Sequence, residues 1–193
     1  AAFFRSLATA CALAASEPNY ARFLLYAVRA TDADDLAPYD AASLDAEFRR
    51  AYALLEKRGS ANHFIQLSRP DALAVAGPEI IDIFTADMPF IVDSVLAAVR
   101  ARGGIIRFVS HPVLPLDPES FRVLEESEAG DRRESFLHLH IDPLPDDAAR
   151  AAMTAEIEQV LDEVAAAVRG WRPMLERLRN LVRQLRENPP PVD

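Results

Sequence analysis

The sequence has 193 residues, half of them hydrophobic, which is enough to bury a core in one domain with an appendage or in two small domains, and which excludes wholesale disorder. Its formal net charge of −9 at pH 7 repels phosphate backbones and argues against nucleic acid as a partner. The single cysteine, Cys11, cannot form an internal disulfide, so we expect a reducing compartment and interpret Cys11 as a small buried residue rather than a nucleophile.

The first residues are apolar enough to raise the question of a signal peptide. They lack a basic region before the apolar part, and Arg5 interrupts the run, so a signal peptide is rejected. No apolar run reaches the roughly 18 residues that a membrane span needs, and we therefore expect no membrane partner and a cytoplasmic location. The sequence does not begin with methionine, which suggests a piece of a longer polypeptide.

The N-terminal segment is predicted to be helical, because apolar residues recur along it at helical spacing. A break at Pro18 separates the first helix from a second over residues 20–28. Ser43 is predicted to cap a third helix, which Gly59 ends. The apolar stripe of the first helix consists of Phe3, Phe4, Leu7 and Cys11.

A strand–helix–strand unit is the clearest pattern in the middle of the chain. Residues 79–84, rich in isoleucine, predict a strand. After a polar turn, apolar residues at helical spacing predict a helix over 90–99. Gly103 and Gly104 end this helix just before a second strand at 105–109.

Further strands are predicted around this unit. Residues 63–67 form a short one, 110–115 continue the strand at 105–109 irregularly, and 121–124 form another. The most regular strand is 135–142, where apolar and polar residues alternate. Leu137, Leu139 and Ile141 face one way, and Phe136, His138 and His140 face the other.

The order from residue 79 onward is β-α-β-β-α, because a long helix follows the last strand and stops at Gly170. With right-handed crossovers this order folds into a ferredoxin-like antiparallel sheet with two helices on one face. A fourth strand is missing after the second helix, and the strand at 63–67 could fill its place. The other face of the sheet is expected to be covered by the N-terminal helices or by another chain.

We therefore predict an α+β fold, with a ferredoxin-like sheet that carries two helices on one face. An N-terminal helical segment (1–60) precedes the α+β domain (61–170). A C-terminal helix and linker (171–193) follow, and that helix begins at Trp171.

Histidines offer one candidate for chemistry. His138 and His140 share a strand face, and His111 could lie on a neighbouring strand, so three imidazoles could bind zinc. No cysteine or carboxylate at ligand spacing accompanies them, and we favour a half-exposed polar sheet face without metal.

The turn before the central helix offers a second candidate. Asp87 and Asp93 could form an acid–base pair, but nothing marks a raised pKa or a pocket. We favour Asp87 as the helix cap, with Pro89 in the first turn. The free N–H groups of a helix start also suit a carboxylate or phosphate.

No motif in the sequence supports a nucleotide-binding site or a catalytic nucleophile. With only 6 glycines, the chain contains neither a dinucleotide fingerprint nor a phosphate-binding loop. Ser110 and Ser135 have no triad-like context. We assign no catalytic, cofactor-binding or metal residues.

The turn and its flanks resemble the start of an ACT domain, a ferredoxin-like module that often binds amino acids. The matching features are Asp87, Pro89, the glycine pair at 103–104 and the isoleucines that follow. The resemblance implies an effector site at Asp87, Met88, Pro89 and Phe90. The family pattern has glycine where this chain has Phe90, and we expect the large side chain to occupy the ligand's space.

A more specific resemblance covers residues 20–178. Ordered motifs are similar to the N-terminal region of the large bacterial NAD-specific glutamate dehydrogenases. The motifs are 36–40 (LAPYD), 87–94 (DMPFIVDS), 111–114 (HPVL), 134–142 (ESFLHLHID) and 171–174 (WRPM).

This second resemblance implies a non-catalytic regulatory or assembly domain of a long, oligomeric enzyme. Such an enzyme oxidatively deaminates L-glutamate to 2-oxoglutarate with NAD, and NAD would bind outside this stretch. The implied partners are other domains or subunits of the enzyme and an amino-acid effector. Two alternatives stay open: a purely structural interaction module that uses a sheet edge or the Phe136 face, and a metalloenzyme that uses His111, His138 and His140.

Overall fold

The computed structural model describes most of the chain. The described residues are 8, 12, 16–55, 57–58, 62–69, 77–117, 119–126, 128, 130 and 132–187. The predicted first helix, with Phe3, Phe4, Leu7 and Cys11, lies outside them, as does Gly59. No helix in the described part is long and apolar enough to cross a membrane.

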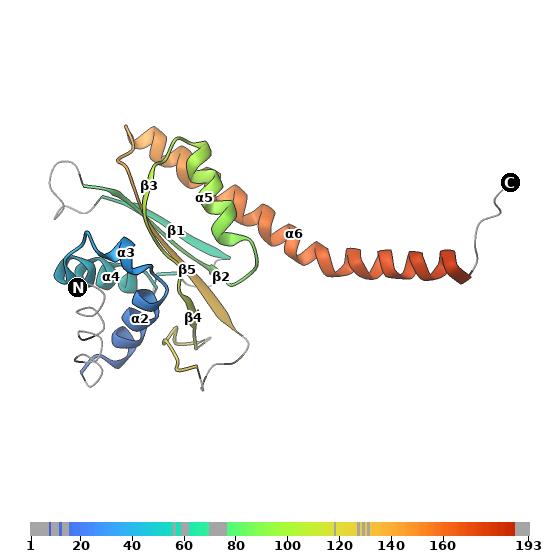
Figure 1. Cartoon of the computed structure of the whole chain (residues 1–193), viewed down its shortest axis with the longest axis horizontal. Coiled ribbons are helices and arrows are strands. Elements are labelled where there is room, and N and C mark those ends of the chain that lie inside the picture. The colour runs from blue at the N-terminus through green and yellow to red at the C-terminus, as the bar shows by residue number, and fades with distance from the viewer. Residues whose placement is uncertain are drawn as a thin grey trace.

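An antiparallel sheet forms the centre of the molecule (Figure 1). Its strands within the described residues are β1 (His63–Ser68), β2 (Glu79–Ala86), β3 (Ile106–Ser110), β4 (Val113–Pro115) and β5 (Arg133–Ile141). They lie in the order β1-β2-β5-β3. β3 pairs with the second half of β5, and β4 pairs with the first residues of β5. β1 pairs with β2 at the place where a ferredoxin-like sheet has its fourth strand. The prediction for residues 63–67 is confirmed.

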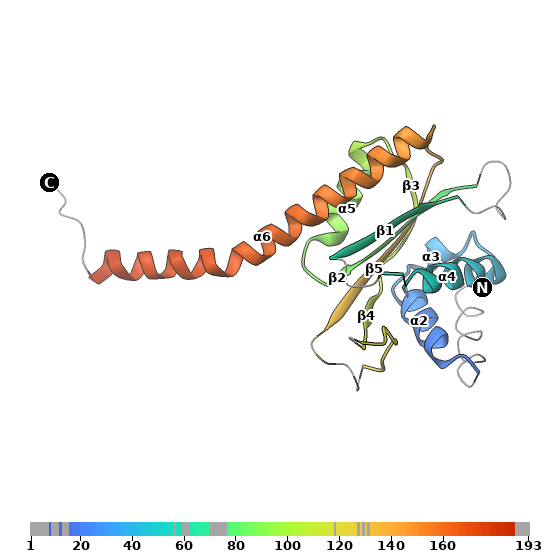
Figure 2. The ribbon, with the colours of Figure 1, turned by 180° about the vertical axis from the view of Figure 1, so that it is seen from behind.

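Two helices cover one face of the sheet, as predicted. They are α5 (Ile91–Ala101) and α6 (Asp147–Glu187), which run side by side on that face in Figures 1 and 2. Alternate residues of β2 and β5 supply the sheet's part of this core, and the period of two is the reason that they share a face. The core consists of Ile81, Ile83, Leu137, Leu139 and Ile141 from the sheet, and of Ile91, Val95, Val99, Met153, Ile157 and Leu161 from the helices. The α+β, ACT-like architecture is confirmed.

The N-terminal helices cover the opposite face. They are α2 (Pro18–Arg29), α3 (Ala33–Leu36) and α4 (Ala41–Leu55). Phe84 and Phe136 stack with ring centroids 4.5 Å apart, and Phe23 of α2 lies 5.4 Å from Phe136. Because Phe136 is fully buried under these helices, the alternative that this face pairs with another chain is wrong.

The predicted end of α5 at the glycine pair is confirmed. Gly103 takes a positive φ of 80°, a conformation that residues with a Cβ atom disfavour. A Cβ atom at Gly104 would lie 2.6 Å from Val99 Cγ1. Both positions therefore require glycine for the chain to turn back into β3.

Several local predictions were wrong. α6 continues through Gly170 and Pro173, because the surrounding residues are good helix formers and the helix bends instead of breaking (Figure 1). Residues 121–124 make only an isolated bridge between Leu116 and Val123. Asp40 rather than Ser43 caps α4, since its Oδ1 accepts from the N–H groups of Ala42 and Ser43 at 3.0 Å.

Candidate functional site

The turn between β2 and α5 contains the four predicted effector residues. Asp87, Pro89 and Phe90 are exposed, and Met88 is half-buried against the α5–α6 core. The N-cap of α5 is Phe90, not Asp87, and no side chain caps this helix start. The predicted Asp87 cap was wrong because the helix begins at Ile91, too far along the chain for that carboxylate to reach its first N–H groups.

Phe90 combines an unusual backbone conformation with an exposed side chain. Its backbone has φ 74°, in the left-handed region, and its side chain is 69% exposed. The conformation is one that glycine adopts readily, and in this chain it places an exposed phenylalanine ring at the start of α5. The expectation that this ring occupies a ligand's space stays a prediction.

Asp87 is instead held by a neighbouring strand. The Ser135 hydroxyl donates to Asp87 Oδ1 at 2.6 Å, and His111 Nε2 lies 3.1 Å from Ser135 Oγ. Since the serine proton points to the carboxylate, His111 Nε2–H is the donor to the serine oxygen. Burial lowers the pKa of His111, although the Asp87 carboxylate opposes the shift.

This cluster is not a nucleophilic triad. In a triad the carboxylate holds the histidine and the histidine accepts the serine proton, whereas here the carboxylate accepts that proton itself. Asp87, His111 and Ser135 come from three different motifs of the resemblance described above. The contact among these three residues was not predicted from the sequence, although the presence of each in one of those motifs was an available signal. The third predicted histidine, His111, therefore lies against Ser135.

A second group of polar residues is buried between the sheet and α4. Asp82 of β2 lies opposite His138 of β5 in register, and the two join at 2.6 Å through Nδ1 and Oδ1. His138 Nε2 lies 3.0 Å from His140 Nε2, and His140 Nδ1 lies 2.8 Å from the Tyr39 hydroxyl. At the other end, Arg50 Nη2 pairs with Asp82 Oδ2 at 2.7 Å. We call these five residues the buried relay.

One set of protons satisfies every contact of the buried relay. Tyr39 donates to His140 Nδ1, His140 Nε2–H donates to His138, and His138 Nδ1–H donates to Asp82. Burial, together with the neighbouring His138 and Arg50, lowers the pKa of His140 to about 2, so its imidazole is neutral. Burial is also the main cause that raises the pKa of Tyr39.

The expectation of a half-exposed polar face at His138 and His140 was wrong, because α4 and Tyr39 cover both rings. Both nitrogens of each ring already have partners. Within the described residues no three histidine, cysteine, aspartate or glutamate side chains are placed to hold a metal ion. A shallow hollow of about 260 Å³ reaches His140 between Tyr39 and α4.

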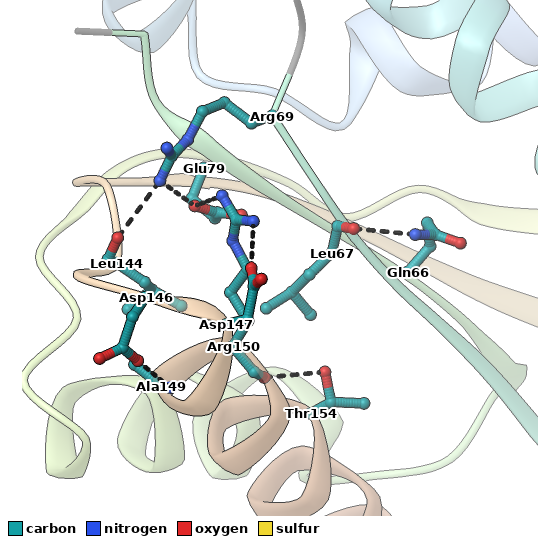
Figure 3. Close-up of polar contacts among 10 residues, drawn as sticks. All are labelled: Gln66, Leu67, Arg69, Glu79, Leu144, Asp146, Asp147, Ala149, Arg150 and Thr154. Atoms are coloured by element: carbon teal, nitrogen blue, oxygen red, sulfur yellow. Dashed lines mark hydrogen bonds and ion pairs between the residues drawn. The ribbon is translucent and has the colours of Figure 1, made fainter.

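A third cluster lies at the far end of β2. The fully buried Glu79 receives Arg150 of α6, with Nε to Oε1 at 2.8 Å, and Arg69 after β1, with Nη2 to Oε2 at 3.1 Å. Figure 3 shows the two arginines converging on this carboxylate, and Arg69 also reaches the Leu144 carbonyl. Both cations pair with Glu79, so the cluster ties the first turn of α6 and the residue after β1 to the start of β2.

Comparison with known proteins gives two matches. The family model described as "Glutamate dehydrogenase, ACT1 domain" matches residues 23–157, well over half of the chain. The NAD-specific glutamate dehydrogenase of Halomonas elongata is 29% identical in an alignment of 147 residues, and the match covers 66% of this chain and 9% of that protein. The chain thus spans only a small part of this relative.

Proposed function

Because the chain belongs to the glutamate dehydrogenase ACT1 domain family, we propose that it is a non-catalytic regulatory or assembly domain of a large NAD-dependent glutamate dehydrogenase. The match over residues 23–157 carries the proposal. The chain's similarity to 9% of a much longer enzyme supports it. The polar clusters also support it, because their side chains are engaged with one another: Ser135 with Asp87, His138 with Asp82, and Arg150 with Glu79.

The parent reaction follows as part of the same proposal. The complete enzyme would oxidise L-glutamate to 2-oxoglutarate with NAD, in the cytoplasm and as an oligomer, and NAD would bind in its other domains. The divisions at residues 1–60, 61–170 and 171–193 remain a proposal. Since α2 and the sheet share one core, the first segment would depend on the second for its burial.

For the regulatory role, we propose the β2–α5 turn as the amino-acid site. The uncapped start of α5 presents N–H groups that suit a carboxylate. The exposed Asp87 carboxylate lies in the same turn and suits an ammonium group. The proposed site consists of Asp87, Met88, Pro89 and the left-handed Phe90. Its helix N-terminus would bind the carboxylate of a free amino acid, and Asp87 would bind the ammonium group.

Isothermal titration of the chain with a panel of L-amino acids tests this site. We expect micromolar binding of one of them, lost in Asp87→Ala. Asp93→Ala removes another exposed carboxylate from the first turn of α5 and serves as the matched control, which should keep the binding. Equal loss in both variants would contradict the assigned role of Asp87.

The alternative function is a structural module without a ligand. One observation favours it: Asp87 Oδ1 is already held by Ser135, so the turn is internally satisfied. Absence of heat with every amino acid would leave this alternative standing. The same result would not contradict a role of the domain in assembly.

A further inference from the structure

The apolar stripe of α6 continues beyond the folded body. The stripe begins with Met153, Ile157 and Leu161, which are buried against the sheet. Apolar residues then recur at heptad spacing to the end of the helix. The same face carries Trp171, Met174, Leu178, Leu181, Val182 and Leu185, which are 41–56% exposed. This half of α6 projects away from the rest of the molecule in both views (Figures 1 and 2).

A sustained 3–4 spacing is the pattern of a helix that packs against another element. In proteins most of the stability of a helix comes from packing of its apolar face, and contiguous exposed apolar residues of this kind mark interaction sites. The projecting half is therefore a surface without its partner.

The charge of this half is opposite to that of the body. From Arg169 to Glu187 the sequence holds six arginines and two glutamates, a net charge of +4. Because the whole chain has a net charge of −9, the rest of the chain has a net charge of −13. On a helix of 3.6 residues per turn, Arg177 flanks the stripe on one side, and Arg179 and Arg186 flank it on the other.

We infer that residues 169–187 are a docking helix for a protein segment with an apolar stripe or groove rimmed by aspartate and glutamate. Carboxylates on both rims would pair with the flanking arginines, while the stripe buries Trp171 and Leu178. The occupant is defined by this chemistry, and the inference does not depend on the proposed function.

Two other occupants fit less well. A second docking helix would bring +4 against +4, and a second copy's body offers only Phe90 and Ile105 as exposed large apolar residues outside α6 among those described. An anionic bilayer would attract the arginines, but it would also repel the strongly acidic body. A protein segment with acidic rims meets both the apolar and the charge requirement.

Trp171 is the only tryptophan and reports on the stripe directly. The probe is a tryptophan-free peptide of about three heptads with Leu at a and d and Glu at e and g, whose like charges prevent self-pairing. We expect a blue shift of the Trp171 emission on titration into the chain, and weaker binding at high salt. The same peptide with Lys at e and g should not bind.

Leu178→Asp should weaken binding by about tenfold or more, because it places a charge in the centre of the stripe. Asn180→Asp is the matched control on the opposite face of the helix and should bind like the wild type. Both positions are exposed, so equal unfolding midpoints would show an intact body.

Three results would overturn the inference. The acidic and basic peptides could bind equally, or Leu178→Asp could bind as the wild type does. The emission could also shift with anionic phospholipid vesicles, or with the chain's own concentration, and not with the acidic peptide.

Discussion

At the scale of single residues, His140 is the buried group whose protonation should affect stability most. Its ring is buried beside His138 and stacks on Phe108 at 4.7 Å. Burial lowers its pKa to about 2, against about 6.5 in an unfolded chain. The folded state therefore excludes a proton that the unfolded state accepts as the pH falls below 6.5.

The sign of the pH effect follows from this difference. Stability that is present above pH 6.5 is lost as the pH falls toward 2. Between pH 7 and pH 5 this group alone should lower the free energy of unfolding by about 2 kcal/mol. Urea unfolding at the two pH values measures the loss.

His140→Gln should make that loss smaller by about the same amount. Part of the slope remains, because burial also lowers the pKa of His111. Tyr26→Phe, which removes an exposed hydroxyl bonded to Glu126, should keep the wild-type loss. An unchanged slope in His140→Gln would contradict the buried, neutral state of this imidazole.

At the scale of elements, a buried ion pair fastens the end of the N-terminal helices to β5. Arg58, just after α4, pairs with Glu134 of β5, and both side chains are buried. Burial raises the pKa of Glu134, while Arg58 opposes the shift. A buried charge that loses its partner is costly.

Glu134→Ala should therefore lower the free energy of unfolding by about 3–5 kcal/mol. Glu126→Ala breaks the exposed pair with Arg133 and should change it by less than about 1 kcal/mol. Chemical denaturation at pH 7 compares the two variants. A similar small effect of both would mean that the Arg58–Glu134 pair does not hold α4 to the sheet.

The elements themselves were largely predictable from the sequence, because each has a clear period. Alternation over 135–142 placed Leu139 on one face and His138 on the other. The ends of elements were less predictable. Pro173 has the chemistry of a helix start, yet it lies inside α6, because tolerance of a kink depends on the residues around it.

The polar clusters could not be predicted, because they depend on register. Asp82 and His138 are 56 positions apart in the sequence, and only the pairing of β2 with β5 sets them opposite each other. Asp82 was nevertheless a signal, being a charged residue within an isoleucine-rich strand. The exposure of Phe90 depends on a left-handed backbone that its residue type disfavours.

At the scale of the whole molecule, the sheet lies between two layers of helices, and one helix leaves the body (Figure 1). Both faces of the sheet are filled by the chain's own residues. Phe90 in the β2–α5 turn and the projecting half of α6 expose large apolar side chains, and we propose both as surfaces for other domains.

The most direct test uses the complete glutamate dehydrogenase polypeptide that we propose contains this chain. Three samples are compared: the complete polypeptide, the same polypeptide without residues 1–187, and the chain alone. For each we measure NAD-dependent glutamate oxidation, its response to L-amino acids, and the oligomer mass. We predict oxidation by the complete polypeptide, none by the chain alone, and a changed oligomer mass or amino-acid response on removal of the domain. Oxidation by the chain alone, or removal without effect on either property, would contradict the account.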